Sequence, residues 1–192
     1  MKIILNRSGM TILETIIVLI IGGLIISGIW VTYSEMSLND KIRRTVNAID
    51  KTTAKTRDFL SARTTVPADL SVRMHDQNLM PAELTFKSTA GNISTYTSPL
   101  SNDFYVTANI TSDRMFFVRV AFKRGSRECQ RLAPIMLGTD RGMNERGIVG
   151  YSLGTLIVGE QTNIPRRTIT PADLLQQCPL SSAIGFYFAV RP

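Results

Sequence analysis

The sequence predicts an α+β fold in which the second half of one long N-terminal α-helix packs on an antiparallel β-sheet. Three observations support this prediction. The run Thr15–Tyr33 is apolar and free of charge, an amphipathic pattern continues it to about Ala62, and runs rich in aromatic and β-branched residues follow. With 192 residues, the chain has room for one sizeable globular domain.

The apolar run near the N-terminus is long enough to cross a bilayer. Together with Met10–Leu13 it spans about 24 residues, or roughly 36 Å as an α-helix. Lys2 and Arg7 precede it, so the positive-inside bias places the N-terminus in the cytoplasm and the chain after Trp30 outside, which in a bacterium is the periplasm. No A-x-A-like cleavage site follows the run, and the helical pattern continues beyond it. We therefore expect the helix to be kept in the mature protein.

One charged residue, Glu14, lies inside the apolar segment. An ionised carboxylate at this place costs several kcal/mol unless it finds a partner, and a plain membrane anchor has no need of it. The alternative is that Glu14 sits at the level of the lipid headgroups near the cytoplasmic face. The residue therefore points to a helix that does more than anchor the chain.

The residues around Glu14 resemble a known processing site. The run Ser8-Gly9-Met10-Thr11-Ile12-Leu13-Glu14 follows a short basic leader and precedes an unbroken hydrophobic helix, as in type IV pilins and type II secretion pseudopilins. The resemblance implies that a membrane prepilin peptidase cuts between Gly9 and Met10 and methylates the new N-terminus. It also implies that the amine of Met10 pairs with Glu14 of a neighbouring subunit during filament assembly.

The resemblance implies a three-part organisation. Residues 1–9 form a prepilin leader, and residues 10–33 form a hydrophobic transmembrane helix that becomes the filament core. Residues 34–192 form a periplasmic globular pilin domain, which includes the amphipathic half of the long helix. The expected fold is thus the type IV pilin fold. Val31 stands where type IVa pilins usually carry proline, which favours the type IVb branch or a pseudopilin.

The amphipathic half of the helix predicts one buried face. Its apolar stripe recurs at helical spacing through Ile42, Val46, Ile49, Thr53 and Leu60. Basic residues lie elsewhere on the segment, and we expect them to be solvated rather than to bind nucleic acid, because no aromatic residues interleave with them. They are Arg43, Arg44, Lys55, Arg57 and Arg63.

The remainder of the chain predicts a sheet with short helices. Thr64–Asp103 is rich in polar residues and proline, and we expect a long connection with short helical turns that resembles the αβ loop of the family. Asp103–Ile110 and Arg114–Phe122 predict a β-hairpin whose aromatic side chains face the long helix. Further expected elements are a short helix bearing Cys129 at the start of Arg127–Leu137, a strand over Ile148–Val158, a helix from Thr170 to Cys178 and a strand over Ala183–Val190.

Cysteine and histidine content limits the chemistry. Cys129 and Cys178 are the only cysteines and form no CxxC motif, and His75 is the only histidine, so we expect no metal site and no cofactor. One disulfide is the natural interpretation and needs an oxidising compartment; the alternative is two unpaired buried thiols. The placement of the two cysteines resembles that in the bundle-forming and toxin-coregulated pilins.

These observations together predict a structural protein and not an enzyme: a major or minor subunit of a type IVb-like pilus, used for adhesion or aggregation. Its expected partners are other pilin subunits, the prepilin peptidase, the inner-membrane assembly machinery and, before assembly, the lipid bilayer. One alternative is a type II secretion pseudopilin, although Asp140 and Glu145 make a poor calcium loop. Another is a minor pilin that binds DNA or a receptor, supported only by the +5 that remains of the formal +7 charge without Lys2 and Arg7.

Overall fold

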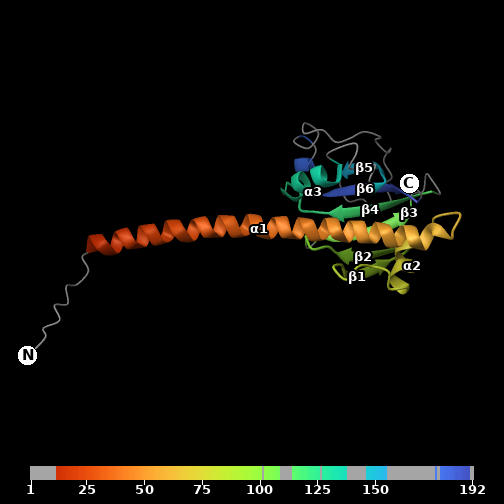
Figure 1. Cartoon of the computed structure of the whole chain (residues 1–192), viewed down its shortest axis with the longest axis horizontal. Helices are drawn as coiled ribbons and strands as arrows, with labels where there is room; N and C mark the ends of the chain where they lie inside the picture. Colours follow the sequence, from red (N-terminus) through yellow and green to blue (C-terminus); the bar gives the residue numbers. More distant parts are fainter. Residues whose placement is uncertain are drawn as a thin grey trace, which may run out of the picture. The chain divides into compact units, whose positions relative to one another are not determined.

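The computed structural model describes residues 12–100, 102–108, 114–125, 127–137, 146–154, 176 and 178–190 (Figure 1). The chain divides into two compact units, Met1–Asn39 and Asp40–Pro192. Helix α1 spans Ile12–Ser61 as one α-helix of 50 residues, so its residues belong to both units. This confirms the predicted long helix.

The second unit contains a six-stranded antiparallel sheet. Its strand order is β1-β2-β3-β4-β6-β5, so the last strand along the chain lies between two earlier ones (Figure 1). The predicted combination of a long helix and an antiparallel sheet is therefore confirmed. The strands are β1 (Thr85–Ala90), β2 (Ile93–Thr97), β3 (Asp103–Ala108), β4 (Met115–Ala121), β5 (Ile148–Gly154) and β6 (Ala183–Ala189).

The central strands bury an aromatic layer on one face of the sheet. Phe104, Phe116, Phe186 and Phe188 are almost completely inaccessible to solvent, and the rings of Phe116 and Phe188 stack with their centroids 5.4 Å apart. The guanidinium of Arg57, on α1, lies over the Phe188 ring at 5.9 Å from its centroid. This face of the sheet is therefore the one turned toward α1.

The predicted β3–β4 hairpin is confirmed, but only some of its aromatic side chains face α1. Successive residues of a strand point to opposite faces. Phe104 and Phe116 therefore face α1, whereas Tyr105 and Phe117 point to the other side, and the expectation is wrong for these two. Phe117 lies over Gly185, where an added Cβ would come within 2.1 Å of its ring.

The buried face of α1 matches the predicted stripe and widens it. Ile42, Val46, Ile49, Thr53 and Leu60 are all buried. Further buried positions are Thr45, Ala48, Thr52 and Thr56. The hydroxyls of Thr45 and Thr56 donate to backbone carbonyls one turn earlier, at 2.9 and 2.7 Å. These bonds let Thr45 and Thr56 enter the core, because each hydroxyl keeps a hydrogen-bond partner.

The segment predicted as a long connection instead contains a short helix, α2 (Leu70–Asp76), and the β1–β2 hairpin. Strand β1 is exposed at every residue, so it lacks the apolar alternation that marks a strand in sequence. Gly91, with φ of +57°, opens the turn between the two strands. Ser71 of α2 accepts a 2.8 Å bond from the backbone N–H of Ser94, which ties the helix to β2.

The last part of the chain agrees with most expectations. Helix α3 covers Arg127–Leu137, and β5 and β6 begin at the predicted residues. The predicted helix from Thr170 to Cys178 lies almost wholly outside the described residues. Cys178 itself begins a short 3₁₀ helix, η1 (Cys178–Leu180), directly before β6.

Candidate membrane and assembly helix

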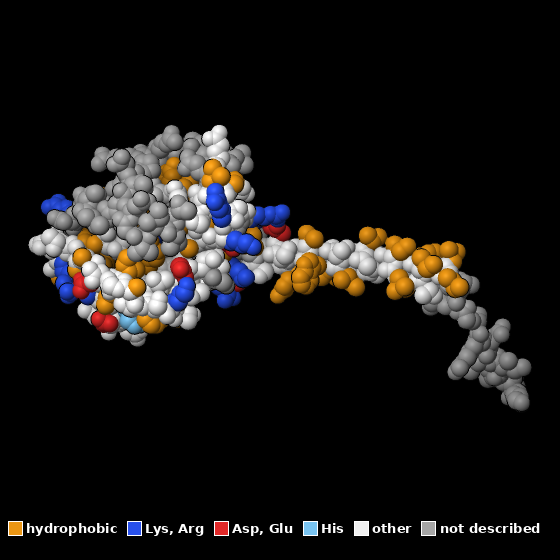
Figure 2. Space-filling model, turned by 180° about the vertical axis from the view of Figure 1, so that it is seen from behind, with side chains coloured by type: hydrophobic (Ala, Val, Ile, Leu, Met, Phe, Trp, Pro, Cys, Tyr) orange, Lys and Arg blue, Asp and Glu red, His pale blue; other side chains and the backbone are white. Residues whose placement is uncertain are grey.

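The described part of the first unit is a helix with an unpartnered apolar surface. Every large apolar side chain from Ile12 to Met36 is exposed, with exposed fractions from 47% to 82%. Figure 2 shows these hydrophobic side chains all along the helix. Within the described residues, α1 alone is long and apolar enough to cross a membrane. An apolar surface of this size calls for lipid or another protein to cover it.

Polar side chains inside the apolar segment are satisfied by the helix itself. The hydroxyls of Ser27, Thr32 and Ser34 donate to the carbonyls of Leu24, Gly28 and Val31 at 2.8, 3.1 and 2.8 Å. None of the three needs water as a partner. This arrangement allows hydroxyl groups to enter a hydrocarbon or protein environment at little cost.

The glycines of the segment are not required by packing within this chain. A Cβ added at Gly22, Gly23 or Gly28 would meet nothing within 4 Å. Small residues on a membrane helix provide places where a second helix can approach closely. Trp30 and Tyr33 stand at the end of the run, and such residues are typical of the boundary between membrane and water.

Glu14 is the only acidic residue in the first turn of α1. A carboxylate is favoured there, because the first turn of a helix carries the positive end of its dipole. Leu13 and Ile17, its near neighbours on the helix, have exposed apolar side chains. Gly9 and Met10 lie outside the described residues, so the cleavage between them and the pairing of Met10 with Glu14 remain predictions.

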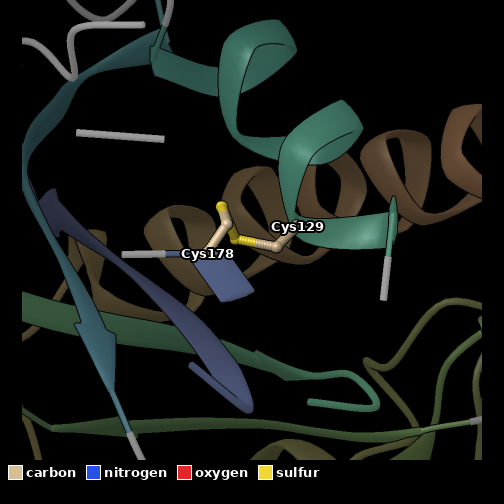
Figure 3. Close-up of a disulfide and its surroundings, with 2 residues drawn as sticks. All are labelled: Cys129 and Cys178. Carbon is tan, nitrogen blue, oxygen red and sulfur yellow. A yellow bond between two sulfur atoms is a disulfide. The ribbon is translucent and has the colours of Figure 1, made fainter. Parts of the chain in front are cut away.

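The predicted disulfide is present in the second unit and joins α3 to η1 (Figure 3). Cys129 and Cys178 are fully buried, with their Cα atoms 5.6 Å apart and a sequence separation of 49. The alternative of two unpaired thiols is wrong. The bond encloses β5 in a covalent loop and holds the start of β6 beside α3.

Arg57 connects α1 to the sheet, and the sequence did not predict this contact. It was expected to be solvated, but it is half-buried and donates to three backbone carbonyls. Its Nε lies 3.2 Å from the oxygen of Ala189, and its Nη2 lies 3.2 Å from that of Arg146 and 3.3 Å from that of Gly147. Burial lowers the pKa of Arg57, yet the ordinary pKa of a guanidinium is so far above neutral that the group stays charged.

An ion pair also joins α1 to this segment. Arg146 Nη1 lies 2.6 Å from both carboxylate oxygens of Asp50. Asp50 and Arg57 are seven residues apart, which places them on one face of the helix two turns apart. That spacing was the available signal for a shared contact, but their partners at residues 146, 147 and 189 could not be read from it.

The sequence predicted a connecting segment around His75, but this residue lies in α2 within a small aromatic cluster. Its ring stacks on Phe86 with centroids 4.2 Å apart, and its Nδ1 lies 2.8 Å from the hydroxyl of Tyr96. Burial, helped by the Asp76 carboxylate, raises the pKa of Tyr96 to about 12. Among the described residues, no group of three or more His, Cys, Asp and Glu side chains could hold a metal ion.

The fold defined by the long helix and the six-stranded sheet is the type IV pilin fold. A solved structure with this fold is the crystal structure of a type IVb pilin from Salmonella typhi, which is 13% identical in sequence and matches with a TM-score of 0.50. The alignment covers 77% of this chain and 98% of that one. No family model and no curated protein matches the sequence. At this identity the likeness establishes the fold alone.

Proposed function

We propose that this protein is a subunit of a type IVb-like pilus, anchored in the inner membrane and then polymerised through the first half of α1. The observation that carries the proposal is the exposed apolar surface from Ile12 to Met36, on a helix that continues into the second unit. Lipid covers this surface before assembly, and the same segments of other copies cover it in the filament. The pilin fold supports the same role.

The proposal includes processing at the start of the helix. Cleavage between Gly9 and Met10 by a prepilin peptidase removes Lys2 and Arg7 and creates a positive amine at Met10. In an apolar environment that amine needs an anionic partner, and Glu14 of a neighbouring subunit provides one. Pairing neutralises both charges and sets the axial position of one subunit against the next.

The proposed location follows from the charges and the disulfide. Lys2 and Arg7 keep the N-terminus in the cytoplasm, which sends the second unit to the periplasm. A buried Cys129–Cys178 bond fits that compartment, because disulfides form and persist where conditions are oxidising. The subunit then leaves the membrane through the pilus assembly machinery and becomes extracellular for adhesion or aggregation.

The role of Glu14 is tested by Glu14→Gln in a strain without the native gene. We expect the variant to be cleaved and to enter the membrane normally, while its amount in the sheared filament fraction falls at least about tenfold, the loss expected for a desolvated charge partner. Glu35→Gln, on the same helix beyond the apolar run, is the matched control and assembles normally. Normal assembly of Glu14→Gln would disprove the pairing.

Processing is tested separately by Gly9→Val. A branched side chain at the cleavage position blocks the peptidase, so the uncut precursor accumulates in the membrane and filaments are absent. Ser8→Ala is cut as usual. Mass spectrometry of the membrane fraction measures both results, and a mature Met10 terminus in the Gly9→Val variant would contradict the proposed site. If deletion of the gene stops protein secretion but leaves surface filaments intact, the protein is a secretion pseudopilin instead.

A further inference from the structure

A pocket of about 390 Å³ lies in the second unit where α1 ends and the chain turns toward α2. Its apolar part is formed by Leu60 from the last turn of α1, Met115 from the start of β4 and Val190 after β6. The volume lies within the range of small-molecule sites, roughly 300–1,000 Å³. The pocket is thus large enough for a compact organic ligand.

The polar part of the pocket is cationic. Arg63 and Arg114 line it together with the hydroxyl-bearing Thr64 and Thr65, and no aspartate or glutamate is among the lining residues. The guanidinium groups and hydroxyls supply N–H and O–H donors to an anion in the pocket. Asp69, whose carboxylate acts electrostatically on Arg63, is not among the lining residues.

Arg63 is held in a position that suits anion binding. Its guanidinium carbon lies 4.5 Å from the centre of the Phe59 ring. A cation–π contact of this kind does not use the N–H groups as hydrogen-bond donors to an oxygen, so they stay available for a carboxylate or phosphate. A side chain held in this way loses less conformational entropy when it binds.

From this combination we propose that the pocket binds a small amphipathic organic anion. A single carboxylate or phosphate group pairs with Arg63 and Arg114, with the threonine hydroxyls as further donors. The apolar body of the ligand lies against Leu60, Met115 and Val190. Arginine suits such a site because its donors match both oxygens of the anionic group at once.

The test uses the full chain in phosphatidylcholine nanodiscs and two probes of similar size, 4-fluorophenyl phosphate and the neutral 4-fluorobenzyl alcohol. Fluorine NMR of the probes measures binding, with empty nanodiscs as the blank. We expect saturable binding of the phosphate at least about tenfold tighter than that of the alcohol, as for a charge-assisted contact. Equal affinities, or no saturable binding, would overturn the proposal.

Three variants locate the binding. Arg63→Gln and Arg114→Gln each weaken binding of the phosphate by about tenfold or more. Arg43→Gln removes an exposed arginine of α1 outside the pocket and leaves the affinity unchanged. Thr65→Trp fills the pocket from an exposed position and abolishes binding of both probes. Melting temperatures confirm that each variant is folded, and wild-type affinity in either pocket arginine variant or in Thr65→Trp contradicts the site.

Discussion

Arg57 connects the long helix to the sheet through three carbonyl oxygens. Those of Arg146 and Gly147 come from the residues before β5, and that of Ala189 comes from the end of β6. The Gly147 carbonyl also accepts a 3.4 Å bond from the backbone N–H of Ala189, and the charged donor adds a stronger bond than a neutral one would. One side chain of α1 thereby holds the ends of two strands.

We expect Arg57→Met to lower the free energy of unfolding by about 2 kcal/mol, because methionine keeps an apolar side chain at this position but removes the hydrogen-bond donors and the cation–π contact with Phe188. Urea unfolding in a mild detergent measures the change. Arg43→Met, at an exposed position of the same helix, changes stability by less than about 0.5 kcal/mol. Equal effects of the two substitutions would show that the carbonyl contacts contribute nothing.

Gly147 makes room for this contact. It has φ of +67°, and a Cβ there would lie 2.2 Å from Nη2 of Arg57. Gly147→Ala therefore adds displacement of Arg57 to the backbone cost, whereas Gly91→Ala, at φ of +57° with nothing within 4 Å, carries the backbone cost alone. We expect Gly147→Ala to lower the free energy of unfolding more than Gly91→Ala does. We also expect this difference to disappear when both substitutions are made in the Arg57→Met variant. An excess that persists there would locate the strain elsewhere.

Tyr96 gives the domain a pH dependence in the alkaline range. Burial raises its pKa from 10.0 to about 12, so the folded state keeps a proton that the unfolded state loses. Stability from this group is complete below pH 10 and is lost as the pH rises toward 12. We expect Tyr96→Phe to make the decline in unfolding free energy across this window shallower. Parallel declines for the two proteins would contradict the assignment.

The disulfide acts at the level of elements, because it joins α3 to the turn before β6 across a loop of 49 positions. Loop-closure entropy predicts that replacing both cysteines by serine costs roughly 4 kcal/mol. Comparison of the melting temperatures of the double variant and the native protein measures this cost. A single Cys129→Ser variant, which leaves one thiol free, serves as the control for side-chain chemistry and should lose a similar amount. Unchanged melting would mean that packing alone holds β6.

The long helix, the β3–β4 hairpin, α3 and β6 could be predicted because each shows its pattern locally. An apolar stripe, an alternating run or a terminal aromatic strand is visible without its partner. Strand β1 was missed because it is an exposed edge strand with Lys87 and polar residues on both faces. Its place in the sheet depends on pairing with β2, and the Gly91–Asn92 turn was the one signal that could have revealed that pairing.

The residues of the candidate site also differ in whether the sequence could predict them. Gly9, Met10 and Glu14 were found from a compact motif, since their chemistry is local in sequence. Arg57 was misjudged because a basic residue on an amphipathic helix is usually solvated, and its acceptors lie near residues 146 and 189. Every residue has a backbone carbonyl, and the sequence does not show which of them accept a side-chain hydrogen bond. A contact of this kind can therefore be identified only in the folded chain.

For the molecule as a whole, the two units differ in whether they bury their own large apolar side chains. The second unit has its own buried aromatic layer, whereas the described part of the first unit buries none of its large apolar side chains. We expect a shortened chain that begins at Ser34 to stay in solution without detergent and to melt within a few degrees of the full chain in micelles. A large loss of stability on shortening would show that the apolar segment supports the fold of the domain.

The position of β6 near the end of the chain determines when the sheet can be completed during synthesis. A chain emerges from the ribosome N-terminus first, so α1, both hairpin pairs and α3 exist before β6 does. Until β6 arrives, β4 has an open edge, β5 has no neighbour and Cys129 has no partner. The sheet therefore closes in one late step. A chain released before that step presents the edge of β4 to other chains, and premature termination therefore favours aggregation.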